Sequence, residues 1–188
     1  MPNLGQSVPV RWLIAIVAFP LGGFLGHAIS GPASTIPAAL LSGAVAGLVI
    51  GLSQGLALHL RSEALVLWTA VTAVGLAAGM AVVTALIGQI ATTPDAVALG
   101  AASGIVLGVG QAVVLKRGGL LRSSWWVWVL VSTAAWSAGW LVTASVGVSL
   151  APGWPVYGLS GAVVSQLITG IAVWRLMAPR PEVIPAPL

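Results

Sequence analysis

Three glutamines lie well inside apolar stretches of this sequence, away from the ends, and their side chains are the ones best suited to form a polar site. Gln54 and Gln111 each follow a glycine of a repeated pattern by three residues, whereas Gln166 lies in a third copy that has Ala172 at the matching position. An amide side chain carries two donors and an acceptor, so between apolar helices it either bonds to a neighbouring helix or lines a polar path. Interhelical bonding is the favoured interpretation, and a polar path is the alternative.

The two histidines add one further candidate to this polar site. His27 is predicted near the outer end of the first apolar stretch and His59 near the inner end of the second. At about 1.5 Å per helical residue, their depths differ by most of a bilayer. The two side chains therefore cannot share a metal ion or a haem, and only His27 is kept as a lining residue of a polar path.

The remaining chemistry-bearing residues predict that the chain is not an enzyme. The only acidic residues, Glu63, Asp95 and Glu182, lie outside the apolar stretches, and the chain has no cysteine. The sequence contains no phosphate-binding loop, no paired carboxylates and no nucleophile with a credible base. We therefore expect no catalytic residue, no cofactor and no metal site.

The composition predicts a membrane protein. Of the 188 residues, 59% are apolar and only 5% are charged, whereas about a quarter of a soluble domain is charged. Each apolar stretch is long enough to cross a hydrocarbon core of about 30 Å as a helix. The predicted fold is all-α and polytopic, with six transmembrane helices over residues 11–29, 37–60, 64–90, 96–115, 124–148 and 156–177.

The basic residues predict the orientation of this domain. Threading the chain through a membrane six times puts every Lys and Arg on one side, which is expected to be cytoplasmic. These residues are Arg11, Arg61, Lys116, Arg117, Arg122, Arg175 and Arg180. We expect a multi-pass protein of the plasma membrane with a cytoplasmic N-terminus (1–9), a transmembrane domain (10–178) and a Pro-rich cytoplasmic tail (179–188). The net charge of +4 serves orientation, so no nucleic-acid partner is expected.

The sequence also repeats itself with a period of nearly 60 residues. Trp12, Trp68 and Trp128 are each followed eleven positions later by a glycine, and the segment 41–45 recurs at 159–163. These matches predict three helical hairpins, over about 10–61, 64–117 and 124–177, arranged about a pseudo-threefold axis along the membrane normal.

Small residues at every fourth position predict how the helices pack. The glycines concerned are Gly43, Gly47 and Gly51, then Gly100, Gly104 and Gly108, then Gly161. Four residues make about one helical turn, so each set forms a groove that lets another backbone approach closely. Packing within the chain is favoured over the alternative of a face for a homo-oligomer or a membrane partner protein.

The nine tryptophans are predicted to serve mainly as interfacial anchors. Trp12, Trp68, Trp125, Trp126, Trp128 and Trp174 lie near the predicted cytoplasmic helix ends, and Trp154 lies at the outer surface. Tryptophan at such depths usually forms an aromatic belt. Trp136 and Trp140 lie in the middle of a helix and are expected to pack against lipid or a glycine groove; binding of a flat apolar ligand is the alternative.

The function predicted from these features is that of a structural or interaction protein of the membrane. The alternative is a small-solute transporter or channel subunit with a polar site around Gln54 and Gln111. In size and helix count the chain resembles the substrate-binding component of energy-coupling-factor vitamin transporters, but its first helix lacks their Ala-xxx-Ala motif, and no family is claimed. A carrier would need a solvent-reachable cavity at the glutamines, whereas a scaffold would be closed by helix contacts.

Overall fold

The computed structural model describes residues 4–88, 90–121, 124–147 and 159–176, with side chains from residue 8 onward. This part of the chain is helical and contains no strand. Its elements are α1 (Leu4–Ile14), the 3-10 helix η1 (Ala15–Val17), α2 (Ala18–Ser30), α3 (Ile36–Ala57), α4 (Ser62–Ile87), α5 (Thr93–Arg117), α6 (Trp125–Ser145) and α7 (Leu159–Leu176).

Six segments of this structure are long and apolar enough to cross a membrane. Five are the single helices α3 to α7, and the sixth, Val8–Ser30, combines the end of α1 with η1 and α2. Each has 18 or more residues and a mean hydropathy between 1.4 and 2.2. The predicted all-α, six-span, multi-pass membrane fold is confirmed, while the threefold symmetry stays a prediction.

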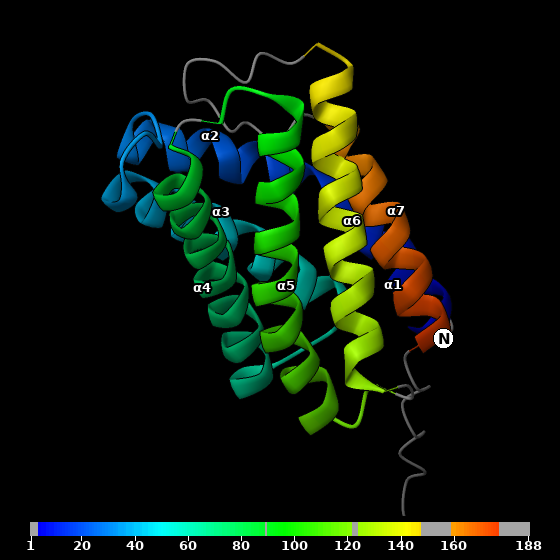
Figure 1. Ribbon diagram of the computed structural model, residues 1–188. Helices are drawn as coiled ribbons and strands as arrows, with labels where there is room; N and C mark the ends of the chain where they lie inside the picture. Colours follow the sequence, from blue (N-terminus) through cyan, green and yellow to red (C-terminus); the bar gives the residue numbers. More distant parts are fainter. Residues whose placement is uncertain (1–3, 89, 122–123, 148–158, 177–188) are drawn as a thin grey trace, which may run out of the picture.

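The helices form a closed ring. Each helix packs against its neighbours in the chain, and α7 packs against α1 and η1, which joins the last span to the first. Within the described residues, no helix packs on a helix across the ring. Figure 1 shows α4, α5, α6 and α7 side by side, with the blue and cyan helices behind them. The middle of the ring is therefore filled by side chains.

The first span differs from a single straight helix. Its backbone tightens into η1 at Ala15–Val17, and in Figure 1 α2 then runs across the bundle while α1 stays beside α7. Pro20 lies just beyond this segment, and a proline in a helix removes one backbone N–H and crowds the carbonyl four residues earlier. A proline at this place is a sufficient cause for the bend.

Two even-numbered spans begin with the same cap. Oγ1 of Thr35 accepts the N–H of Ala38 at 3.4 Å, and Oγ1 of Thr92 accepts the N–H of Asp95 at 3.3 Å. Each threonine is followed two residues later by a proline at the first turn, where its missing N–H costs nothing. The two caps are 57 residues apart, which is also the spacing of Gln54 and Gln111.

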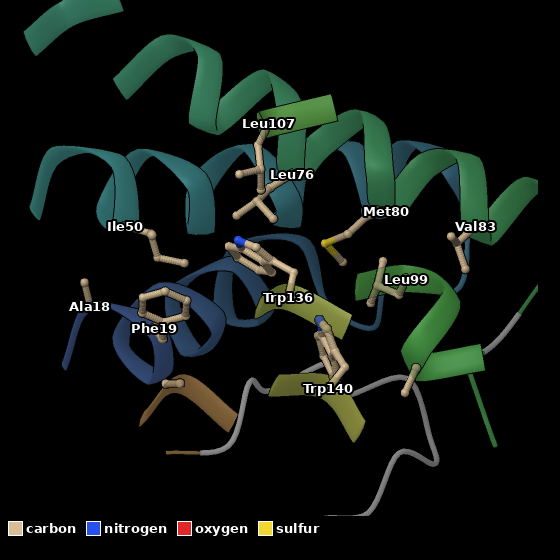
Figure 2. Close-up of a cluster of buried hydrophobic side chains, with 13 residues drawn as sticks. Ala18, Phe19, Ile50, Leu76, Met80, Val83, Leu99, Leu107, Trp136 and Trp140 are labelled. Carbon is tan, nitrogen blue, oxygen red and sulfur yellow. The ribbon is translucent and has the colours of Figure 1, made fainter. Parts of the chain in front are cut away.

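The core has two layers along the bundle axis. The apolar layer includes Phe19, Leu76, Met80 and Trp136, which come from three different spans. Figure 2 shows Trp136 in the middle of this layer, and its ring centroid lies 5.6 Å from that of Phe19. The other layer, the tryptophan layer, is built around Trp12, Trp68 and Trp128. It lies toward the basic end, the end of the bundle that carries Arg11, Arg61, Lys116, Arg117 and Arg175.

The prediction that six tryptophans form an interfacial belt is wrong for three of them. Trp12, Trp68 and Trp128 are only 1%, 0% and 1% exposed, and their rings meet inside the ring of helices. Position along a helix gives the depth of a residue but not the face on which it lies, and these three lie on inward faces. Trp125, Trp126 and Trp174 do face outward, whereas Trp154 lies outside the described residues.

Of the two surroundings expected for the mid-helix tryptophans, lipid is wrong. Trp136 and Trp140 are 5% and 4% exposed, so neither faces lipid. Both belong to the apolar layer, where they pack among large side chains such as Leu99 and Met80 (Figure 2). Neither of these two indoles is on an open surface where a flat ligand could bind without displacing core side chains.

Candidate functional site

Gln54 forms a hydrogen bond across the ring from α3 to α7. Its Nε2 donates to Oε1 of Gln166 at 2.9 Å, and the two residues are 5% and 0% exposed. Two of the predicted site residues, which lie 112 positions apart in the sequence, are therefore in direct contact.

Gln166 joins this bond to the first span. Its Nε2 donates to the backbone oxygen of Trp12 at 2.6 Å. In a regular helix that oxygen would accept the N–H of Ile16, but Ile16 lies in η1, where the backbone has tightened. The amide of Gln166 thus satisfies a carbonyl beside the break, and it links α7 to α1 and α3 at once.

Gln111 forms a second junction, between α4, α5 and α6. Its Nε2 donates to Oγ1 of Thr72 at 3.0 Å, and its Oε1 accepts Nε1–H of Trp128 at 3.3 Å. Thr72 in turn donates to the backbone oxygen of Trp68 at 2.8 Å. Gln54 and Gln111 therefore do not bond to each other; each serves a different group of three helices.

Trp12, Trp68 and Trp128, which we call the axial tryptophans, lie between these two junctions. Trp12 meets Trp68 edge to face with ring centroids 6.4 Å apart, and Trp68 lies 6.3 Å from Trp128. The first pair is edge to face and the second is tilted, and aromatic pairs at such distances add stability beyond the area that they bury. Together the glutamines and the tryptophans form one continuous polar and aromatic layer, which we call the glutamine–tryptophan layer.

Thr169 of the last span contacts the tryptophan of the first hairpin. Trp12 donates its Nε1–H to Oγ1 of Thr169 at 3.0 Å, and Cδ1 of Trp12 lies 3.1 Å from where a methyl group at Gly170 would be. Ala172, which sequence matching aligned with Gln54 and Gln111, lies three residues further on. A shift of three residues keeps a residue near the same face of a helix, so the sequence alone could not reveal it.

The glycines of α3 lie against α4. A methyl group at Gly47 would lie 2.5 Å from Cα of Ala73, and one at Gly43 would lie 2.7 Å from Cα of Ala77. Gly51 continues the same contact toward the tryptophan layer, and all three glycines are buried. These backbones touch over about two helical turns, and no larger residue fits there without moving a helix.

The glycines of α5 make the corresponding contact with α6. A methyl group at Gly104 would lie 2.7 Å from Cα of Thr133, and one at Gly100 would lie 2.8 Å from Cα of Ser137. Gly108 is buried on the same face. Thr133 and Ser137 follow Ala73 and Ala77 by 60 residues, which is also the spacing of Trp68 and Trp128.

Glycine contacts extend to helix pairs that the sequence did not single out. Gly161 of α7 lies directly against the backbone oxygen of Gly139 and against Oγ1 of Thr143, both on α6. Gly75 of α4 faces α5, where a methyl group would lie 2.5 Å from Cα of Leu107. Small residues on the odd-numbered spans thus also take part in close helix contacts.

The histidines are not part of the glutamine–tryptophan layer. His27 is half-buried near the end of α2, roughly 20 Å along the span from Trp12 at about 1.5 Å per residue. His59 lies in the turn after α3 with a φ of 55°, a conformation uncommon for residues other than glycine, and Nη1 of Arg11 approaches its Nδ1 and Nε2 at 3.0 and 2.9 Å. The four predicted lining residues therefore do not form one site.

The chemistry available at this layer is that of uncharged hydrogen bonding. Its groups are amides, hydroxyls and indole N–H groups, none of which titrates near neutral pH. Among the residues that the structure describes, no three His, Asp or Glu side chains come together as metal ligands would. The layer can join helices or hold a small polar molecule.

Sequence reasoning found the glutamines but missed Thr72, Thr169 and the inward-facing tryptophans. The signal was present, because the tryptophan spacing matched in all three odd-numbered spans. A repeated tryptophan at one depth fits a belt as well as a central layer, and only the helix rotation separates the two. No protein-family model matches the chain, and no curated protein or solved structure is significantly similar to it.

Proposed function

We propose that this chain is a non-catalytic membrane protein of structural or interaction type, in which the glutamine–tryptophan layer joins the six helices. The observation that carries the proposal is the bonding of the three glutamines. Each is at most 5% exposed, and each bonds to side chains or backbone of another helix. Polar side chains that serve transport need access to solvent, whereas each of these amides is nearly fully buried and is bonded to another helix of the bundle.

The glycine contacts support the same proposal. They bring backbones together along α3–α4 and α5–α6, so the ring is built from close helix pairs. The glutamine–tryptophan layer then links these pairs to one another at one level along the bundle. We take the matched caps and matched glycine contacts as support for three repeated hairpins about a pseudo-threefold axis. The resulting bundle is suited to act as a packing partner, in a homo-oligomer or beside another membrane protein.

Native mass spectrometry of protein released from its membrane in mild detergent tests this function. We expect a mass made of protein chains and lipid only, with no stoichiometric polar solute. The alternative function, a small-solute carrier, is favoured by one observation: Nε1 of Trp68 and Oγ of Ser132 are buried at this layer and have no partner among the described residues. A solute adduct that disappears in Gln54→Leu would establish the carrier and refute the structural role.

We further propose that the protein lies in the plasma membrane with both termini in the cytoplasm. The support is the distribution of charge: the basic residues gather at one end of the bundle, and the two turns at 31–35 and 88–92 carry no Lys or Arg. The chain has no native cysteine, so single cysteines are clean reporters. In intact cells, an impermeant thiol reagent should label Ser34→Cys and leave Ser124→Cys unlabelled; the reverse pattern would invert the orientation.

A further inference from the structure

One of the three axial indoles differs from the other two. Trp12 and Trp128 donate their Nε1–H groups to Thr169 and Gln111, whereas Nε1 of Trp68 has no hydrogen-bond partner among the residues that the structure describes. Trp68 is nevertheless 0% exposed. Buried N–H groups in native proteins are almost always bonded, either to protein atoms or to ordered water.

A matching acceptor lies on the adjacent helix. Nε2 of Gln166 donates to a carbonyl, which fixes the orientation of that amide, so its Oε1 must accept from Nε2 of Gln54. Oε1 of Gln54 is therefore directed elsewhere, and within the described residues it accepts no hydrogen bond. Nε1 of Trp68 is thus an unused donor of the layer and Oε1 of Gln54 an unused acceptor; Oγ of Ser132 lies in the same layer and also has no partner among the described residues.

The two groups belong to the same neighbourhood. Gln54 precedes Gly55, and a methyl group at Gly55 would lie 3.3 Å from Cδ1 of Trp68, the atom bonded to Nε1. Gln54 also reaches, through Gln166, the backbone of Trp12, whose ring meets Trp68 edge to face. At the other junction, the corresponding pair is bonded directly, because Trp128 donates to Oε1 of Gln111.

We propose that one water molecule is bound inside the bundle, where it accepts from Nε1 of Trp68 and donates to Oε1 of Gln54. The surroundings are closely packed, which favours a guest of this size. The rings of Trp12 and Trp128 flank Trp68, and a methyl group at Gly55 would lie only 2.6 Å from Cδ1 of Leu65. A buried water needs two to four polar partners, and this donor and acceptor supply two. The inference rests on the proposed structural role of the layer, because the water completes the bonds of Gln54.

Indole NMR tests this proposal on the full-length protein. With ¹⁵N-labelled tryptophan in lipid nanodiscs, the Nε1–H of Trp68, assigned from Trp68→Phe, should show a rotating-frame Overhauser peak at the water frequency. The indoles of Trp12 and Trp128 should show none. The Trp68 peak should be lost in Gln54→Leu and in Gln54→Met, which preserves side-chain length, and retained in Leu52→Ala, a lipid-facing change on the same helix.

Two results would overturn the bound water. One is the absence of a water peak at Trp68 in the unmodified protein, and the other is a peak that persists when Gln54 is replaced. Failure of the structural role has a different signature. In that case the Gln54 variants would retain full thermal stability, whatever the indole of Trp68 reports.

Discussion

The ring of helices is closed by two different kinds of contact. Along α3–α4 and α5–α6, glycines bring the backbones so close that a methyl group would lie 2.5–2.8 Å from the facing Cα at Gly43, Gly47, Gly100 and Gly104. Between the first span and α7, the closure instead depends on side chains: Trp12 bonds to Thr169, and Gln166 bonds to the backbone of Trp12. We call these contacts the glycine seams and the bonded seam.

The difference between the glycine seams and the bonded seam indicates where a membrane protein needs polar groups. Straight helices can pack over several turns through small residues, since the attraction in lipid comes from close contact of backbones. The first span is interrupted at η1, so it cannot present a long smooth groove to α7. Hydrogen bonds compensate there, and they also satisfy a carbonyl that the broken helix leaves without its usual partner.

The largest expected effect comes from filling a glycine seam. Gly47→Leu and Gly104→Leu should each abolish folding or lower the yield of folded protein severely, because each side chain would overlap a facing backbone. Overpacking costs about 1–3 kcal/mol in deformable cores and more where backbone must move. Yield and monodispersity after purification, together with thermal unfolding, measure the effect.

Matched changes on the lipid-facing surface provide the control for the glycine variants. Ala70→Leu on α4 and Val113→Leu on α5 add bulk to exposed positions and should be tolerated. If all four variants unfold at similar temperatures, the glycine seams have no special role and the comparison of two seams fails.

A smaller loss is expected from the bonded seam. Gln166→Leu removes two hydrogen bonds and leaves both the backbone oxygen of Trp12 and Nε2 of Gln54 unpaired. An unpaired buried polar group costs roughly 1–3 kcal/mol, so this variant should be the least stable of the single glutamine-to-leucine variants. Unfolding measured in lipid nanodiscs, with the lipid-facing Leu167→Ala as control, decides whether the bonded seam stabilises the ring.

The two junctions of the layer should act independently. Gln54→Leu and Gln111→Leu should each cost on the order of 1 kcal/mol, and the double variant should cost the sum to within about 0.5 kcal/mol. The reason is that Gln54 bonds to Gln166, whereas Gln111 bonds to Thr72 and Trp128. Strong non-additivity in the unfolding free energies would mean that the two glutamines share one site.

Much of this fold could be predicted because lipid imposes simple rules on sequence. Six apolar stretches, separated by turns, specify six spans almost without regard to packing. The break in the first span was not predicted, although Pro20 is visible in the sequence. Prolines are tolerated in transmembrane helices when the surrounding structure accommodates them, and the side chain that bonds to the backbone beside this break, Gln166, lies in the last span.

The site was predicted in part, and what was missed depends on helix rotation. Gln54 and Gln111 were found because a polar residue in an apolar stretch is conspicuous at any rotation. The inward position of Trp68 could not be read from its depth. The residue of α7 that contacts Trp12 is Thr169, three positions before Ala172, the residue that sequence matching aligned with the glutamines. Such features are set by the packing of whole helices, which the local pattern of residues does not determine.

A double-mutant cycle on Gln54 and Gln166 tests the central claim most directly. The claim is that these amides hold α3, α7 and the first span together, and the two meet in one bond of 2.9 Å. From the unfolding free energies of Gln54→Leu, Gln166→Leu and the double variant, we predict a favourable coupling of roughly 0.6–1.7 kcal/mol, as found for interhelical bonds in membranes. A coupling of zero, with both single variants as stable as the unmodified protein, would contradict the account.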